Sequence, residues 1–242
     1  MNPLEIHYIL RIIFAYLGEK DRTNIYNTCR IFRQNYLWVS PTDSMMNCIK
    51  HDNRTLANEI LGTEREYITP NDTLFGESYT QNYPKLLELC IQYGIDPSQG
   101  GNFAIRHASE MGYLPIIEIL LKDPRVDPSN DSNYPIIIAS ENGHLHVVDK
   151  LLMDPRVDPS ANNNEAIYTA SSYGNLDIVE RLLLDPRVDP SDHDNASIHS
   201  ALGGDHFHVV ERLLMDSRID PSDYHDEIIR TASEYGYLSI VG

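Results

Sequence analysis

The chain is poor in cysteine, with three among its 242 residues. An odd and widely spaced set of this kind does not build the disulfide framework of a small secreted protein, and it favours a reducing, intracellular environment. Long apolar runs are also missing. The N-terminal apolar segment, residues 6–17, is interrupted by Arg11, is too short to cross a bilayer and lacks the cleavage site of a secretory signal. We therefore expect an intracellular, cytoplasmic protein.

Basic residues are scarce as well. The sequence has 36 Asp and Glu against 19 Lys and Arg, which makes a formal net charge of -17. Such a surface repels phosphate backbones and anionic membranes, because binding to either depends on an excess of Lys and Arg. We expect neither nucleic acid nor a membrane as a direct partner.

Motifs that carry catalysis are missing too, since the chain has no Gly-rich phosphate loop, nucleophile elbow or Cys-pair metal site. The best metal candidates are two His-x-His pairs, His144 with His146 and His206 with His208. Residues i and i+2 point apart on a helix, so these pairs are expected to be structural rather than chelating. We predict no metal, no cofactor and no catalytic residue, and an enzyme with a hidden site is the weakest hypothesis.

What the sequence does contain is an internal repeat. From residue 95 onward the chain falls into copies of equal length without a gap, with a period of 31, the step from Asp96 to Asp127. An aspartate and an alanine stand in register in every copy: Asp96, Asp127, Asp158, Asp189 and Asp220, and Ala108, Ala139, Ala170, Ala201 and Ala232. Each copy reads as two helices. One such hairpin cannot bury its apolar side alone, so neighbouring copies must stack.

Polar residues and glycines mark the expected helix ends. The first helix should begin at an Asn or Asp that caps free backbone amides and end at a Gly in left-handed geometry. These residues are Asn102, Asn133, Asn164, Asn195 and Asp226 at the start, and Gly112, Gly143, Gly174 and Gly236 at the end. The second helix, as in residues 145–152, places Leu145, Val148, Leu151 and Leu152 on one stripe. The sequence DPRVDPS then stops it, because Pro cannot continue a helix.

This pattern resembles the ankyrin repeat. The family's T-P-L-H-x-A-A…G-H…V-V…L-L signature maps without a gap onto the following residues of one copy: Tyr134-Pro135-Ile136, Ala139, Gly143-His144, Val147-Val148 and Leu151-Leu152. The resemblance implies an all-α solenoid of helix-turn-helix repeats that binds a protein. The copies depart from the family in being two positions shorter than its usual repeat and in placing Asp205 where the family has Gly. The DPRVDPS variant resembles arrays of large DNA viruses and some protists.

Weaker copies extend the array toward the N-terminus, where Asn71 lies one full period before Asn102. We predict degenerate ankyrin-type repeats at 43–94 and regular ones at 95–242. The last copy is incomplete, since the sequence stops within its second helix, and we expect that copy to fray.

Residues 1–42 break the repeat and are predicted to form a small helical head. They resemble an F-box at Pro3, Glu5, Ile6, Leu10, Leu17, Asp21, Cys29, Arg30, Phe32, Arg33, Leu37 and Trp38. The resemblance implies that Pro3, Leu10 and Leu17 contact a Skp-type adaptor of a cullin ubiquitin ligase, while the repeats choose the substrate. The alternative is a plain helical cap on the first repeat.

Asp and Arg recur in the linkers between copies, as Asp154, Arg156 and Asp158 illustrate. They form either an acidic ladder that binds ions or a structural set, in which Asp accepts backbone bonds in the turn and Arg offsets nearby carboxylates. Their recurrence favours the structural role, since partner contacts differ between copies.

The positions that differ between copies are the tips of the connecting loops, or fingers, and the last residues of the first helices. In ankyrins both line the concave face that holds a protein partner. The resemblance thus implies binding by Glu110, Met111, Asn130, Asp131, Glu141, Asn142, Ser172, Tyr173, Asp192, His193, Asp223, Tyr224, Glu234 and Tyr235. Aromatic anchors are expected among them, and their acidic neighbours predict a basic partner for a monomeric scaffold. The alternatives are solvent positions without a role and a degenerate family member with no selected partner.

Overall fold

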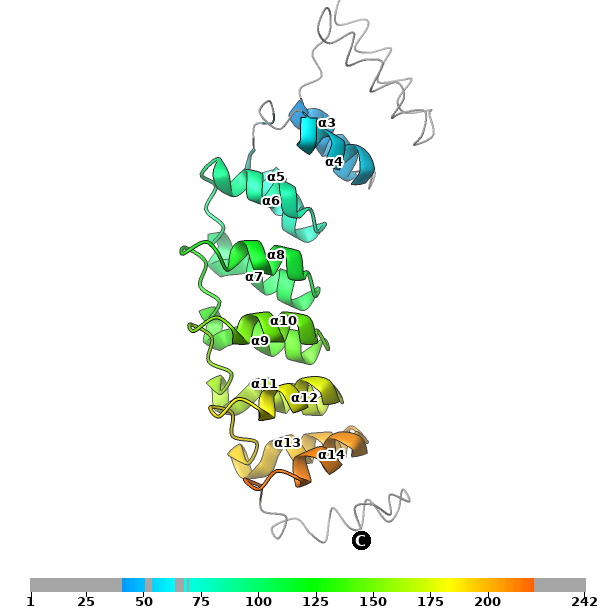
Figure 1. The fold of residues 1–242 in the computed structure, drawn as a ribbon, viewed down its shortest axis with the longest axis vertical. Helices are drawn as coiled ribbons and strands as arrows, with labels where there is room; N and C mark the ends of the chain where they lie inside the picture. The colour runs from blue at the N-terminus through cyan, green and yellow to red at the C-terminus, as the bar shows by residue number, and fades with distance from the viewer. Residues whose placement is uncertain (1–40, 51–53, 64–67, 69, 220–242) are drawn as a thin grey trace, which may run out of the picture. The chain divides into compact units, whose positions relative to one another are not determined.

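A computed structural model of the chain describes residues 41–50, 54–63, 68 and 70–219. All regular secondary structure in these residues is α-helical (Figure 1). The helices divide between two compact units, Met1–Ile95 with α3–α6 and Asp96–Gly242 with α7–α14. The predicted all-α solenoid of helix-turn-helix repeats is confirmed for the described residues. None of these helices is long and apolar enough to cross a membrane.

The helices have the following bounds. The first unit contains α3 (Pro41–Lys50), α4 (Arg54–Thr63), α5 (Asp72–Thr80) and α6 (Pro84–Gln92). The second contains α7 (Gln99–Glu110), α8 (Leu114–Leu120), α9 (Asn130–Glu141), α10 (Leu145–Leu152), α11 (Ala161–Ser172), α12 (Leu176–Leu183), α13 (Asp192–Gly203) and α14 (Phe207–Leu214). Two predicted regions lie outside the described residues: 1–40 with Pro3, Leu10 and Leu17, and 220–242 with Asp223, Tyr224, Glu234 and Tyr235.

The hairpins of the second unit stack in chain order (Figure 1). Each first helix packs on the next, α7 on α9, α9 on α11 and α11 on α13, and the second helices α8, α10, α12 and α14 form the other layer. Ala139 and Ala170, which stand in the repeated alanine register, are both fully buried. Their small side chains let neighbouring first helices approach closely.

The buried part of the apolar stripe on α10 is shorter than the sequence predicted. Val147, Val148 and Leu151 are fully buried, whereas Leu145 and Leu152 are half-buried. Leu145 and Leu152 are the first and last residues of the helix. The neighbouring helices therefore cover its middle better than its ends.

The predicted role of the repeated Asn as a helix cap is wrong in three copies. Asn164 has a left-handed backbone, with φ of 59°, and its Oδ1 accepts a 2.7 Å hydrogen bond from the backbone N–H of Asp189 in the next repeat. Asn102 and Asn133 accept the same bond, each at 2.8 Å, from the backbone N–H of the residue 25 positions later, Asp127 and Asp158. Asn71 does cap its helix, because its extended backbone (φ -143°) lets Oδ1 accept from Leu74 N–H.

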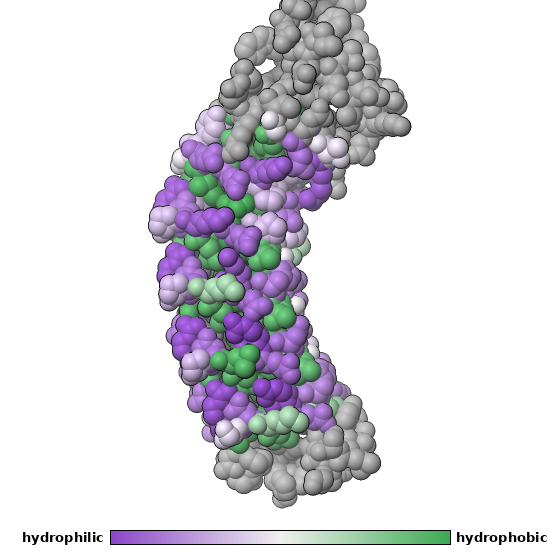
Figure 2. Space-filling view, viewed as in Figure 1, coloured by the Kyte–Doolittle hydropathy of each residue, from purple (hydrophilic) through white to green (hydrophobic). Residues whose placement is uncertain are grey.

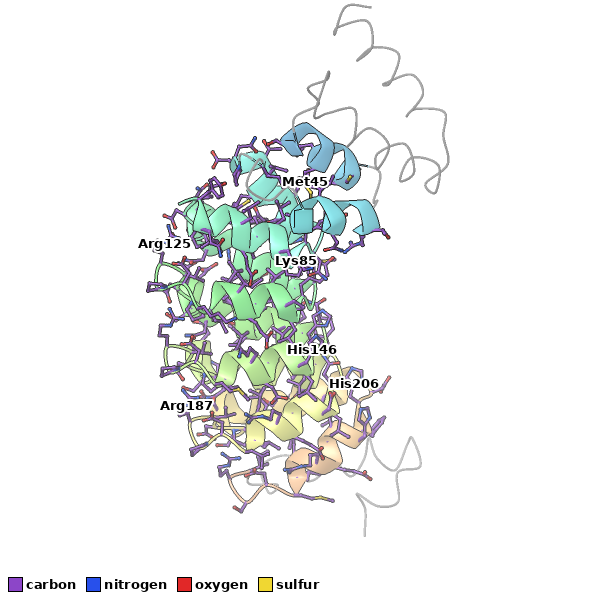
Figure 3. All side chains as sticks on the ribbon, turned by 45° about the horizontal axis from the view of Figure 1, so that its top comes forward. Met45, Lys85, Arg125, His146, Arg187 and His206 are labelled. Carbon is purple, nitrogen blue, oxygen red and sulfur yellow. The ribbon has the colours of Figure 1, made fainter. Side chains whose placement is uncertain are left out.

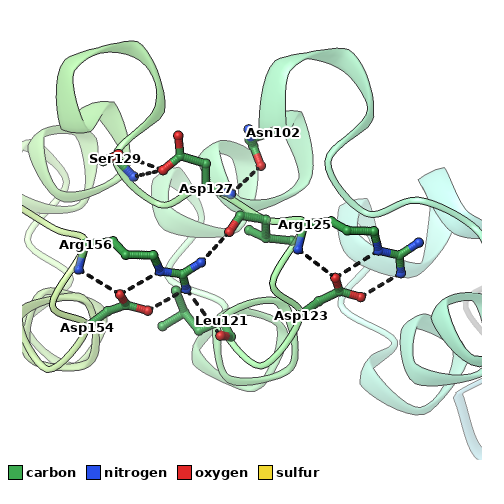
Figure 4. A network of polar contacts seen from close by, with 9 residues as sticks. Asn102, Leu121, Asp123, Arg125, Asp127, Ser129, Asp154 and Arg156 are labelled. Atoms are coloured by element: carbon green, nitrogen blue, oxygen red, sulfur yellow. Dashed lines mark hydrogen bonds and ion pairs between the residues drawn. The ribbon is translucent and has the colours of Figure 1, made fainter.

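The Asp-Arg linkers join consecutive repeats (Figure 4). Asp154 accepts bonds from the backbone N–H of Arg156, at 3.0 Å, and from its guanidinium, at 2.6 and 2.9 Å. The bonded guanidinium lowers the pKa of Asp154. Arg156 also donates to the Val126 carbonyl in the preceding linker at 2.7 Å, and Arg187 and Arg218 make the same bond to Val157 and Val188, one and two linkers later. The structural role predicted for these residues is confirmed, and it includes a bond between successive linkers that the sequence did not suggest.

Candidate protein-binding surface

The fingers and the first helices share one surface, which we name the first-helix face. It consists of the exposed parts of residues 99–111, 130–142, 161–173 and 192–204. All predicted contact residues that the structure describes belong to these ranges. Those that end a first helix are Glu110, Met111, Glu141, Asn142, Ser172 and Tyr173, and those in the fingers are Asn130, Asp131, Asp192 and His193. The largest exposed side chains among them are Tyr173 and Met111, at 57% and 46% exposure.

The backbone conformation of the fingers restricts which residue types they can hold. Three successive residues in each finger have positive φ: Gly100–Asn102, Asp131–Asn133, Asn162–Asn164 and His193–Asn195. Gly, Asn and Asp tolerate this left-handed conformation best, and they dominate these segments. Asp131 and His193 thus occupy positions where the backbone restricts the residue type. The backbone conformation is therefore a constraint on the finger residues in addition to any contact with a partner.

The His-x-His pairs lie at the opposite edge of the repeats from the linker arginines. Figure 3 shows His146 and His206 on one edge, and Arg125 and Arg187 on the other. His206 Nε2 lies 3.0 Å from the Ser172 carbonyl, and His208 Nε2 lies 3.2 Å from the Gly174 carbonyl of the preceding repeat. His144 and His146 make equivalent contacts.

The rings within each pair do not point apart as predicted. The ring centroids of His206 and His208 are 6.2 Å apart, because His206 precedes α14 as its N-cap residue rather than lying within the helix. Both rings reach back to the preceding repeat, in keeping with a structural role. Among the described residues no group of three or more His, Cys, Asp or Glu could hold a metal ion.

Aromatic and charged side chains form a cluster on α7. Phe103 stacks on His107 with a centroid distance of 5.9 Å, and the Arg106 guanidinium lies 5.8 Å from the Phe103 ring centroid. Arg106 also approaches the Asp131 carboxylate of the next repeat at 3.6 Å.

Two repeats further on, Tyr173 and Glu141 share a hydrogen bond, and that bond raises the pKa of the Tyr173 phenol.

Comparison with protein families identifies part of the array. The family model described as ankyrin repeats (3 copies) matches residues 123–194. Residues 123–194 are ankyrin repeats. Ankyrin repeats indicate a scaffold for protein–protein interaction. No curated protein matches the chain.

The ankyrin repeats and the copy before them carry aromatic side chains that the sequence reasoning missed. Phe103, Tyr134 and Tyr168 are 46%, 37% and 41% exposed on the first-helix face. The contact residues predicted from the sequence lie in the fingers and at the last positions of the first helices, whereas these three lie near the start and middle of the helices. Phe103 and Tyr134 occupy the position where the family has Thr, and two aromatic residues in that position were a usable signal.

Charges are segregated within the repeats that contain α9–α14. Residues 130–142, 161–173 and 192–204 contain Asp and Glu but no Lys or Arg. The cations lie in the linkers and second helices, where they pair with acids: Lys150 with Glu118, Arg181 with Asp149 and Arg212 with Glu180. On the first-helix face of the second unit, Arg106 is the one Lys or Arg among the described residues, and it already approaches Asp131.

Apolar side chains also recur where the second helices end. Met153, Leu184 and Met215 stand at one position of three successive repeats and are 73%, 74% and 78% exposed. Hydrophilic residues cover most of the face drawn in Figure 2, with separate hydrophobic groups between them. Since Met153, Leu184 and Met215 are mostly exposed, they contribute little to the core. They therefore offer control positions for tests of the first-helix face.

Proposed function

We propose that the ankyrin repeats bind a protein partner through the first-helix face. The observation that carries the proposal is the set of exposed aromatic side chains, Phe103, Tyr134, Tyr168 and Tyr173, on three consecutive first helices. The exposed parts of these aromatic side chains add nothing to the core, yet they supply large contact areas at low entropic cost when a partner covers them. Their distribution suits a partner that spans several repeats.

The residues named from the sequence belong to the same proposal with different weights. Tyr173 and Met111 are the proposed anchors, because they are large and exposed. Glu110, Glu141, Asn142 and Ser172 surround them and are proposed as polar contacts. Asn130, Asp131, Asp192 and His193 are proposed to contact the partner from the fingers, within the residue types that a left-handed backbone allows.

Substitution of Tyr173 by Ala tests this proposal. We expect about a 10- to 100-fold loss of affinity for partners captured by the full chain, as for an aromatic hot spot. The free energy of unfolding should change by less than about 0.5 kcal/mol, because the side chain is 57% exposed. Affinity is measured by calorimetry with a captured partner, and stability by urea unfolding.

Leu184→Ala is the matched control for Tyr173→Ala. Leu184 is 74% exposed but follows the second helix α12, away from the first-helix face. We expect unchanged affinity for this variant. If both variants weaken binding equally, the first-helix face is not the binding surface.

We also propose that the repeats continue through residues 43–94. The hairpin of α5 and α6 supports this, since Asn71 stands one full period before Asn102 and Leu86 and Leu89 are buried in the hairpin. The weaker signature reflects substitutions that keep apolar residues at the core positions.

The F-box-like head leads to a narrower proposal, in which the chain delivers its partner to a cullin ubiquitin ligase. Its support is the sequence resemblance over residues 1–42. We expect the full chain to retain a purified Skp-type adaptor, and Leu10→Asp to lose it while partner binding stays unchanged. If the unsubstituted chain retains no adaptor, the head is a helical cap instead.

A further inference from the structure

One guanidinium on the first-helix face makes few hydrogen bonds. Among the described residues, Arg106 donates a single side-chain bond, from Nη2 to the Gly100 carbonyl at 3.4 Å, which is longer than a usual N–H···O bond. Its Nε is buried and has no hydrogen-bond partner among them. Buried donors without a partner are rare in folded proteins, because an unmade bond costs free energy. The chain itself therefore leaves most of this guanidinium without hydrogen bonds.

The linker arginines show how the same fold satisfies a guanidinium. Arg156 donates two side-chain hydrogen bonds to the Asp154 carboxylate, at 2.6 and 2.9 Å, and two to backbone carbonyls, at 2.7 and 3.4 Å. The Asp154 side chain is only 11% exposed, so little water competes for the pair. Arg106 has no comparable carboxylate and is the one cation of the first-helix face among the described residues.

The nearest carboxylate is a weak partner for Arg106. Asp131 Oδ2 lies 3.6 Å from Nη1, beyond hydrogen-bond range, and the Asp131 side chain is 64% exposed. Exposed pairs of this kind contribute little, because water screens both charges. Glu110 follows one turn later on α7, yet in the part of the chain that the structure describes only Asp131 forms an ion pair with Arg106. The Nη groups are therefore available to an acceptor from outside.

The position of Arg106 makes this charge important for binding. Its guanidinium lies 5.8 Å from the centre of the Phe103 ring, which is 46% exposed on the same helix. A partner that covers Phe103 also takes the guanidinium out of water. Removing a charge from water without compensation is costly. A carboxylate compensates best, because its two oxygens match the parallel N–H donors of a guanidinium.

We propose that the partner places a carboxylate on Arg106, while its apolar groups contact the aromatic side chains of α7, α9 and α11. The carboxylate comes from an Asp or Glu side chain or from the C-terminus of the partner, since both present the same two oxygens. This inference rests on the proposed function, because it assumes that the first-helix face binds a protein. The sequence predicted a basic partner, whereas at α7 the requirement is for negative charge. The partner is thereby oriented, with its acidic group at α7.

The test uses three variants of the full chain. Arg106→Gln removes the charge and keeps a long polar side chain. Lys122→Gln is its matched control, because it removes one positive charge at an exposed position just after α8, in the same repeat but outside the first-helix face. Asp131→Asn removes the carboxylate that competes for Arg106 and keeps a residue type that tolerates the left-handed backbone. Urea unfolding checks that each variant is folded.

The probes are synthetic random 12-residue peptides with free C-termini, selected on the unsubstituted chain and kept when Tyr134→Ala weakens their binding. Their affinity should fall about ten-fold or more either when their Asp and Glu become Asn and Gln or when their C-terminus is amidated, which distinguishes the two sources of the carboxylate. Arg106→Gln should cause a similar loss, and Lys122→Gln a change of less than about two-fold. Asp131→Asn should strengthen binding about two-fold or more, because it removes the competing carboxylate.

Three outcomes would overturn the inference: equal effects of Arg106→Gln and Lys122→Gln, peptides that bind as well without any carboxylate, and weaker binding to Asp131→Asn. In each of these cases the dependence of the peptides on Tyr134 leaves the proposed function standing. If Arg106→Gln does not fold, Asp131→Asn and the modified peptides still decide the question. If no selected peptide depends on Tyr134 or Tyr173, the proposed function fails and this inference fails with it.

Discussion

Gly174→Ala is expected to destabilise the ankyrin repeats by about 2–4 kcal/mol. Gly174 has φ of 73°, and an L-residue pays about 1–2 kcal/mol in that region. The new Cβ would also lie 2.5 Å from Nδ1 of His206, and overpacking of this kind costs about 1–3 kcal/mol. The ring can move away only by giving up its contact with the Ser172 carbonyl. Urea unfolding followed by circular dichroism measures the change.

Two further variants separate the causes of this loss. The first combines Gly174→Ala with His206→Ala, which removes the steric conflict between the new Cβ and the ring. His206→Ala should therefore lower the free energy of unfolding less in the Gly174→Ala chain than in the unsubstituted chain. Gly203→Ala should instead stabilise the array by about 0.5–1 kcal/mol, because Gly203 is the last residue of α13 and the position of an added Cβ is open. Destabilisation of similar size in Gly203→Ala and Gly174→Ala would contradict the geometric explanation.

Asn164→Ala is expected to cost about 2–3 kcal/mol, because Asn164 connects two repeats. The substitution removes the 2.7 Å acceptor of the Asp189 N–H, at a cost of about 0.5–1.5 kcal/mol for a part-buried hydrogen bond. It also places alanine in left-handed geometry, at about 1 kcal/mol or more. A helix cap would account for a smaller loss of about 1 kcal/mol.

Neighbouring variants test this assignment by urea unfolding. Asn164→Gly keeps the backbone conformation and removes the side chain, so it should show the cost of the two side-chain hydrogen bonds, one from the Asp189 N–H and one to the Asp192 carboxylate, without the backbone cost. Asn163→Ala lies next to it with φ of 60° and an exposed side chain, and it should show the backbone cost alone. If Asn164→Gly is as stable as the unsubstituted chain, the bond to Asp189 contributes nothing.

The candidate site was predicted only in part. Met111 and Tyr173 were named because the last residues of the first helices differ between copies, and both are exposed. Tyr134 and Tyr168 were missed because aromatic residues in an amphipathic helix are as typical of a core as of a surface. Their exposure depends on where the next hairpin packs, which a comparison of copies does not reveal.

By itself, the sequence determined the helical repeat and the C-terminal ends of its first helices. The period can be counted directly in the sequence. The apolar spacing and the glycines that end first helices act within a few residues along the chain, so their effect can be read locally, as at Gly112, Gly143 and Gly174. Tertiary structure alone decided the contacts between repeats and between successive linkers. Asn164 reaches Asp189 and Arg187 reaches Val157, over 25 and 30 residues. Such partners meet only after neighbouring hairpins stack, because the position of each hairpin depends on the burial of the apolar side of the one before it.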